Sequence, residues 1–384
     1  MRLFYEWGTR QLQKAGEELC GDSVMVARQA DCVTLALSDG LGSGVKANIL
    51  SILTTRIAMH LIENGLALNE VVETLSKTLP VCDVRKLAYS TFAIGQFFRD
   101  GGAHIVEFDT PSFILLRQRK QFIAPYEKRQ IEDKTIRESE LHLQIGDWIV
   151  FVSDGVVNAG IGGLYPLGWG LDHVARFLAE HCHPDLFAQD VADKLAASVS
   201  ELYCNKPGDD VSVAVIKVRH KLVATVLTGP PVNREADEAL VSRFTQRRGF
   251  LVVCGGTTAG IVTRHSGGKS LEVDLKTIKA DVPPLARIDG IDLTTEGILT
   301  LTKANDLLKS GANKETVKYN TDGASSLLRM FMDVDHVHFI VGLSVNPAHQ
   351  NPALPRQLGM KLAVVKEISE ELRKRGKEVS IETV

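Results

Sequence analysis

Acidic residues at the ends of strand-like runs constrain this sequence more than any other feature. Between residues 22 and 218, apolar or alternating runs typical of strands recur, and turn residues separate them. Four acidic segments stand at the ends of such runs: Gly21-Asp22-Ser23, Ser38-Asp39-Gly40, Ser153-Asp154-Gly155 and Gly208-Asp209-Asp210. If neighbouring strands of one sheet carry these segments, their carboxylates meet in one place.

A cluster of this kind indicates bound cations. Carboxylates held together without matching Lys or Arg side chains repel one another strongly. All-oxygen ligands suit hard divalent ions such as Mg²⁺ or Mn²⁺ rather than zinc. A single Asp-Gly pair is more often a plain turn. Four acidic strand ends, with no hairpin-like partner strand after Asp39 or Asp154, favour a metal site instead.

Longer motifs in the same order resemble a known family. They are ELCGDS at 18–23, SDGLGSGVKA at 38–47, TPSF at 110–113, LQIGD at 143–147 leading to VSDGV at 152–156, and DDVSV at 209–213. Over residues 10–218 this order is similar to the SpoIIE-type serine phosphatases. These are bacterial members of the PPM (type 2C) superfamily, alongside RsbU and RsbX.

The resemblance implies an α+β fold, a PPM-type αββα sandwich, with two Mn²⁺ or Mg²⁺ ions. Asp39 would bridge the ions, with Asp22 on one ion beside the Gly40 carbonyl and Asp154 and Asp209 on the other. Asp39 and Asp22 are therefore the expected catalytic residues. Asp210, at a position that is often Asn in the wider superfamily, would be either a neighbour of the ligands or a further ligand beside Asp209.

The implied activity is hydrolysis of phosphoserine or phosphothreonine by in-line attack of a metal-bridging hydroxide. The expected substrate is a phosphorylated bacterial regulatory protein, such as a STAS-type anti-sigma antagonist, and a homodimer is possible. Arg10 and Lys14 are the candidates for holding the substrate phosphate. The alternative is a catalytically silent phosphoprotein-binding scaffold with a small-ligand-sensing C-terminal domain. The intact aspartates favour the enzyme.

Charge and cysteine content exclude several other classes. The net charge of −3 gives no reason to expect nucleic acid or an anionic membrane as a partner. The longest apolar runs are far shorter than a membrane span, and the N-terminus lacks a signal-like stretch, so a cytoplasmic location is expected. Six cysteines without CxxC pairs suggest neither zinc nor disulfides.

The sequence also predicts two domains, residues 1–219 and 220–384, the second an α/β domain without a recognised family. Helices are expected over 45–61, from an N-cap at Asn69, and over 171–181, 186–202, 294–310 with Thr294 as N-cap, and 355–375. The Gly-Thr-rich stretch 254–260 after a strand is either a tight turn or an anion site. Asp333, Asp335, His336 and His338 are either metal ligands or, more commonly, surface polar residues.

Overall fold

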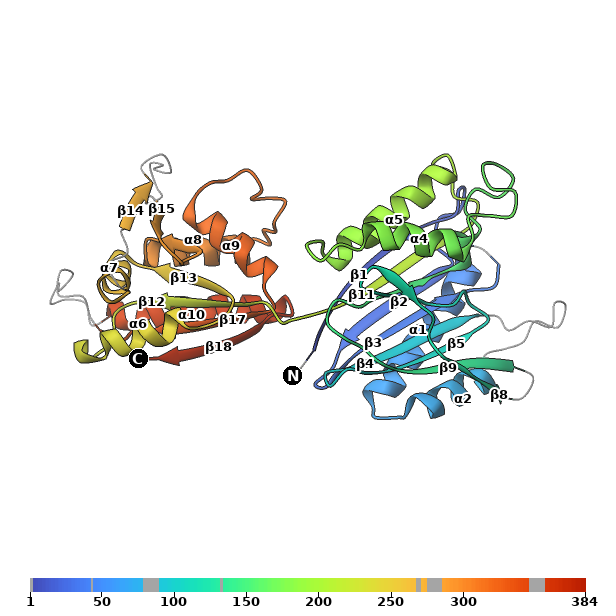
Figure 1. Cartoon of the computed structure of the whole chain (residues 1–384), viewed down its shortest axis with the longest axis horizontal. Coiled ribbons are helices and arrows are strands. Elements are labelled where there is room, and N and C mark those ends of the chain that lie inside the picture. The colour runs from blue at the N-terminus through green and yellow to red at the C-terminus, as the bar shows by residue number, and fades with distance from the viewer. Residues whose placement is uncertain are drawn as a thin grey trace. The chain divides into compact units, whose positions relative to one another are not determined.

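The computed structural model describes residues 3–42, 44–78, 90–131, 134–266, 271–274, 285–344 and 356–384. Ser43 of the SDGLGSGVKA motif and Cys82 lie outside these residues. The chain forms two compact units, Met1–His220 and Lys221–Val384 (Figure 1). Each unit is described by itself below.

The first unit is built on two antiparallel sheets. The strands of one sheet are β1 (Phe4–Leu12), β6 (Ile114–Arg117), β7 (Lys120–Phe122), β10 (Trp148–Val152) and β11 (Val211–Arg219). Those of the other are β2 (Asp22–Arg28), β3 (Cys32–Asp39), β4 (Phe92–Phe98), β5 (Gly102–Phe108), β8 (Glu127–Ile131) and β9 (Lys134–His142). Their orders are β1-β11-β10-β6-β7 and β2-β3-β4-β5-β9-β8.

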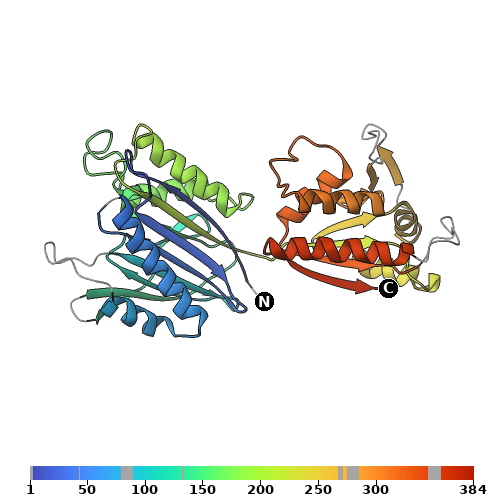
Figure 2. The same cartoon turned by 180° about the vertical axis from the view of Figure 1, so that it is seen from behind.

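Helices cover the outer face of each sheet. On the six-stranded sheet lie α1 (Gly44–Glu63) and α2 (Leu68–Thr78), while α4 (Leu171–His181) and α5 (Ala188–Leu202) pack on the five-stranded sheet (Figures 1 and 2). A single turn, α3 (Asp154–Val157), follows β10. The αββα sandwich expected from the sequence is therefore confirmed.

Strand β3 shows why the sequence favours this layering. Val33, Leu35 and Leu37 point into the core between the sheets, whereas Ala36 packs against the helices. Because successive side chains of a strand point to opposite faces, a strand buried on both faces reads as a nearly continuous apolar run. The run at 32–37 has this character.

Helix α1 is long and apolar enough to cross a membrane by length and composition, with 39% of that stretch buried. Core helices of soluble proteins meet the same criterion, so the finding is weak evidence. In this structure Ser23 Oγ and Thr55 Oγ1 lie 2.8 Å apart and join α1 to β2.

Helix α2 begins before the predicted cap. Leu68 is its first residue, so Asn69 lies within the first turn, and the prediction of Asn69 as N-cap is wrong. The carboxylate of Glu70 accepts a hydrogen bond from the Ala67 N–H at 3.1 Å. This acidic side chain satisfies an N–H group that the helix itself leaves unpaired.

The second unit is an α/β domain, as expected. Its strands are β12 (Val223–Thr228), β13 (Phe250–Cys254), β14 (Leu271–Asp274), β15 (Leu285–Ile288), β16 (Leu293–Thr295), β17 (His336–Val341) and β18 (Glu378–Thr383). The sheet order is β14-β15-β16-β13-β12-β17-β18, and the five strands from β16 to β18 are parallel.

Helices lie on both faces of this sheet. They are η1 (Arg234–Ala236), α6 (Asp237–Thr245), α7 (Gly256–His265), α8 (Ile298–Lys309), α9 (Gly323–Asp333) and α10 (Arg356–Lys374). One core contains α6 and α7, and the other contains α8, α9 and α10. The arrangement is doubly wound.

One local prediction in this unit is wrong, and another needs an addition. Thr294 belongs to β16 and pairs with Val253, and α8 starts at Ile298 after Gly297. Pairing in a parallel sheet outweighs the local capping preference of threonine. The stretch 254–260 is not only a turn, because α7 begins within it at Gly256.

The acidic and histidine cluster near β17 makes ordinary polar contacts. Asp335 accepts a hydrogen bond from the Leu222 N–H at 2.7 Å. Ring nitrogens of His336 and His338 lie 2.8 and 2.7 Å from Ser380 Oγ. These contacts fit surface polar residues that tie β17 to its neighbours.

Candidate functional site

The first pair of acidic residues lies at one end of the six-stranded sheet. Asp22 is the first residue of β2 and Asp39 the last residue of β3, and the antiparallel register places them directly opposite each other. Residues paired in this way have Cβ atoms about 5 Å apart, and like charges there are destabilising. Asp22 is buried, with 4% of its surface exposed, and Asp39 is half-buried.

The second group comes from the other sheet. Asp154 follows β10 as the first residue of α3, and Asp209 and Asp210 directly precede β11, the antiparallel neighbour of β10. Asp210 is buried and accepts a hydrogen bond from the Lys14 N–H at 3.0 Å. Asp209 accepts one from the Asp210 N–H at 3.0 Å. Adjacent strand ends thus carry acidic residues in both sheets.

The pKa shifts of these carboxylates show that they interact electrostatically. Burial, together with the charges of Asp22, Asp154, Asp209 and Asp210, raises the pKa of Asp39. Burial is also the main cause that raises the pKa values of Asp22 and Asp154. For Asp22 the effect is opposed by hydrogen bonds from Ser153 and Ser212. The aspartates from the two sheets therefore form one electrostatic group.

Two glycines allow the backbone to pass close to this group. A Cβ at Gly40 would collide with the carbonyl of Ala47 in α1, and a Cβ at Gly155 would collide with the carbonyl of Asp210. Only glycine fits at such close approaches. Gly40 therefore positions α1 against the end of β3, beside Asp39.

The carboxylate oxygens of this group, and one buried oxygen that lacks a hydrogen-bond partner, fit divalent cations. Asp22 Oδ2 is buried and has no hydrogen-bond partner among the described residues. A buried charged oxygen without a partner is costly, and a cation would satisfy it. Among the described residues, no Lys or Arg forms an ion pair with Asp22, Asp39 or Asp154.

The carboxylates share one end of the sandwich, where hydrogen bonding to Asp39 opposes the rise in the pKa of Asp154 and so connects the acidic residues of the two sheets. Within the part of the chain that the structure describes, no three His, Cys, Asp or Glu side chains are grouped so that they could hold a metal ion. The assignment of Asp22, Asp39, Gly40, Asp154 and Asp209 as ligands therefore stays a prediction.

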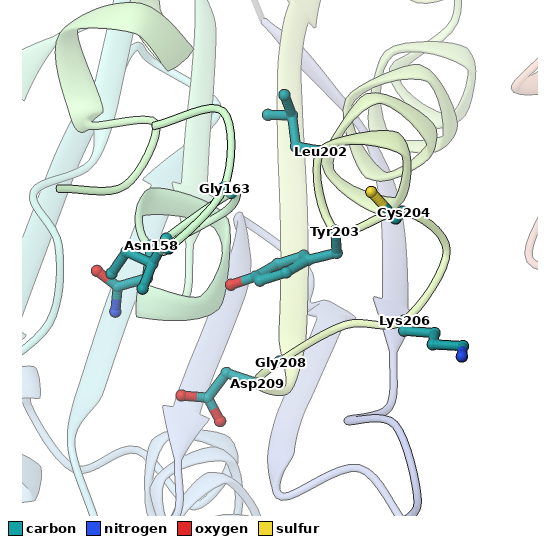
Figure 3. A pocket seen from close by; sticks show the side chains of 11 residues that line it. Asn158, Gly163, Leu202, Tyr203, Cys204, Lys206, Gly208 and Asp209 are labelled. Atoms are coloured by element: carbon teal, nitrogen blue, oxygen red, sulfur yellow. The ribbon is translucent and has the colours of Figure 1, made fainter. Parts of the chain in front are cut away.

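A pocket of about 470 Å³ opens beside Asp209. Its lining includes Asn158, Tyr203 and Lys206, and Figure 3 shows the Tyr203 ring extending toward Asn158 with Asp209 below it. The Tyr203 hydroxyl donates to the Gly155 carbonyl at 2.8 Å. The pocket is therefore joined to the turn that carries Asp154.

The two phosphate-binding candidates differ in position. Arg10 Nε lies 3.8 Å from Asp193 on α5, so its side chain is directed to a surface partner. Lys14 Nζ lies 3.9 Å from Asp209 Oδ1, at the margin of the acidic group. Of the two, only Lys14 has its charge beside the aspartates.

Three supporting residues were not anticipated from the sequence. Gln11 Nε2 donates to Ser212 Oγ at 2.9 Å and to the Asp22 carbonyl at 3.2 Å, linking β1, β11 and β2. The third is Tyr203, which follows α5 and has no motif around it. The DDVSV motif contains Ser212, but nothing in it signals contact with Asp22.

Comparisons with known proteins show what the first unit is similar to. The family described as "Stage II sporulation protein E (SpoIIE)" matches residues 29–219. Stage II sporulation protein E from Bacillus subtilis (strain 168) is 23% identical over 233 residues, which is 56% of this chain and 26% of that protein. The chain thus spans about a quarter of the length of this curated relative.

Solved structures give similar matches. One, the PP2C phosphatase domain with a fragment of the regulatory domain of SpoIIE from Bacillus subtilis, is 19% identical. It covers 58% of this chain and 64% of that one, with a TM-score of 0.49. Another, RsbX in complex with magnesium, is 16% identical and covers 56% and 95%, with a TM-score of 0.41.

Proposed function

We propose, from the premise that residues 29–219 form a domain of the SpoIIE family, that this chain is a metal-dependent protein serine/threonine phosphatase. The reaction is hydrolysis of a phosphoserine or phosphothreonine ester by in-line attack of water on phosphorus. Phosphate and the free hydroxyl side chain are the products.

The observation that carries the proposal is the Asp22–Asp39 register, with Asp154, Asp209 and Asp210 at adjacent strand ends of the facing sheet. Two divalent cations, Mn²⁺ or Mg²⁺, would be held by Asp39 between them, by Asp22 with the Gly40 carbonyl, and by Asp154 with Asp209. When bound, such cations lower the pKa of water and neutralise phosphoryl oxygens.

The other residues position this group. The Ser212 N–H donates to Ser153 Oγ at 2.9 Å, which locks the end of β10 to the start of β11. Tyr203 fixes the Gly155 carbonyl on the same turn. The pocket beside Asp209 would receive the phosphorylated segment, with Lys14 and Lys206 as the nearby cations for its phosphate.

The proposed substrate is a phosphorylated bacterial regulatory protein of the STAS type. This part of the proposal rests on the family alone. Small regulatory proteins present phosphoserine on their surface, and an open pocket with flanking glycines at 160, 162 and 163 suits a protein substrate better than an enclosed cavity does.

The test is release of phosphate from a phosphoserine peptide and from p-nitrophenyl phosphate, with Mn²⁺ and with EDTA. Activity is expected only with the cation, and Asp39→Asn should lower kcat/KM by about 100-fold or more. Asp185→Asn is the matched control, because that side chain is 88% exposed and pairs only with His183 among the described residues. Full activity in EDTA would exclude the mechanism.

The same experiment distinguishes the scaffold alternative. A chain that retains the phosphopeptide but releases no phosphate with Mn²⁺ or Mg²⁺, and behaves identically after Asp39→Asn, is a silent binding module.

A further inference from the structure

A second cavity, of about 540 Å³, lies in the C-terminal unit. It is lined by the segments that follow the carboxyl ends of β12, β13, β16 and β17, and by the start of α10. From β12 the chain proceeds through β13 to β16 on one side, then returns to β17 on the other side of β12. In a doubly wound sheet, the crevice at this reversal of strand order is where ligands bind.

Two helices begin at this cavity, and glycines occupy their caps. Gly255 precedes α7 and Gly297 precedes α8, and a glycine has no side chain with which to cap its helix. The two turns pack together, since a Cβ on Gly297 would lie 3.3 Å from the Gly255 Cα. Neighbouring helix N-termini concentrate positive partial charge.

A lysine from a third helix adds a full charge independently. Lys361 of α10 lines the cavity and is half-buried. Its amine lies against Gly229, where a Cβ would collide with it, and donates to the Gly342 carbonyl at 3.5 Å. No carboxylate pairs with it among the described residues. Burial lowers the pKa of Lys361, so an anionic partner would be strongly stabilising.

The remaining lining indicates what else the ligand carries. Leu299 and Met360 are 61% and 50% exposed, which offers an apolar surface beside the charged end. Glu296 Oε2 is buried without a hydrogen-bond partner among the described residues, and a hydroxyl group would satisfy it. A volume of this size suits a molecule much larger than phosphate.

We propose that this cavity binds a nucleotide, with its phosphate between Lys361 and the N-termini of α7 and α8. The base lies on Leu299 and Met360, and a ribose hydroxyl donates to Glu296. This site is separate in chemistry from the carboxylate group of the first unit, and it does not depend on the phosphatase proposal.

The test is isothermal titration calorimetry on the full chain with AMP, ATP, adenosine and inorganic phosphate. EDTA is present throughout, so that phosphate cannot bind through cations at the aspartates. Saturable binding of AMP or ATP is expected, at least tenfold tighter than that of adenosine or phosphate.

Two variants test the assigned contacts. Lys361→Gln removes the charge, and Gly256→Asp places a carboxylate where a Cβ meets nothing within 4 Å. Aspartate in the first turn of a helix favours folding, so Gly256→Asp should retain the native structure. Each should weaken nucleotide binding at least tenfold, whereas Lys366→Gln, exposed on the same helix, should not.

The proposal is overturned if neither AMP nor ATP binds saturably in EDTA. It is also overturned if adenosine binds as tightly as AMP, or if Lys361→Gln and Gly256→Asp, with native far-ultraviolet circular dichroism, bind nucleotide as the unmodified chain does.

Discussion

The two units both gather loops at the ends of their central strands, but the first places a cluster of aspartates there, and the second places Lys361 and two helix N-termini beside Glu296. In the first unit the strand ends carry Asp22, Asp39 and Asp154, with no Lys or Arg paired to them among the described residues. In the second they carry glycine caps, helix N-termini and Lys361, with no carboxylate paired to that lysine among the described residues. The first arrangement suits cations and the second suits an anion.

Under the two proposals, strand ends determine where each site forms, while side-chain charge determines what it binds. Backbone groups at strand ends are not fully paired within the sheet, so loops and helix termini collect there in either architecture. An uncompensated charge at such a place lowers the stability of the free protein and favours its ligand.

The largest effect on the free energy of unfolding is expected from removing core aromatic rings, because each unit has its own hydrophobic core. Phe97 lies between the two sheets of the first unit, and Phe331 of α9 packs against Phe339 of β17 in the core of the second. Each Phe→Ala change should lower the free energy of unfolding by about 3–5 kcal/mol. Calorimetry should show that only the transition of the altered unit moves.

The control for these variants is Tyr319→Ala, since that ring is 88% exposed. If Phe97→Ala and Phe331→Ala each shift the unfolding transitions of both units equally, the two units do not unfold independently.

Glu107 is a buried carboxylate that, unlike the aspartates at the strand ends, has a cation beside it. Glu107 accepts a hydrogen bond from the Phe113 N–H at 2.7 Å, and its Oε2 lies 3.4 Å from Arg137 Nε. Burial nevertheless raises the pKa of Glu107 from 4.5 to about 7, against the opposing effects of Arg137 and that N–H.

Between pH 4.5 and about 7 the folded chain holds this proton more tightly than the unfolded chain, so stability falls as pH rises through that range. Relative to Glu107→Gln, the unmodified chain should lose up to about 3 kcal/mol. Urea unfolding at several pH values measures this, and parallel curves for the two proteins would contradict it.

The smallest effect on stability is expected from changing Asp39, one of the aspartates that no Lys or Arg pairs with among the described residues. Asp39→Asn removes a repelling charge, so in EDTA the variant should be more stable than the unmodified chain, by about 1 kcal/mol. With Mn²⁺ the order should reverse, because only the unmodified chain gains stability from the cation. Urea unfolding with and without Mn²⁺ tests both parts, and a variant that keeps the Mn²⁺ gain would remove Asp39 from the ligand set.

The sequence by itself determined much of the first unit. Runs such as 32–37 and 148–152 predict strands, acidic residues mark their ends, and the family resemblance implies the sandwich that the strands form. Asp22, Asp39, Asp154 and the pair Asp209–Asp210 were therefore identified together, because side-chain type and strand position are both local properties.

Tertiary structure decided what local pattern could not. The opposition of Asp22 to Asp39 depends on strand register, and the contacts of Gln11, Ser212 and Tyr203 join segments up to about 200 positions apart. In the second unit, Thr294 lies in a strand because it pairs with β13. The order of the strands places the segments that line the cavity around Lys361 side by side. Such proximity arises from packing between distant segments, for which a single sequence contains no local signal.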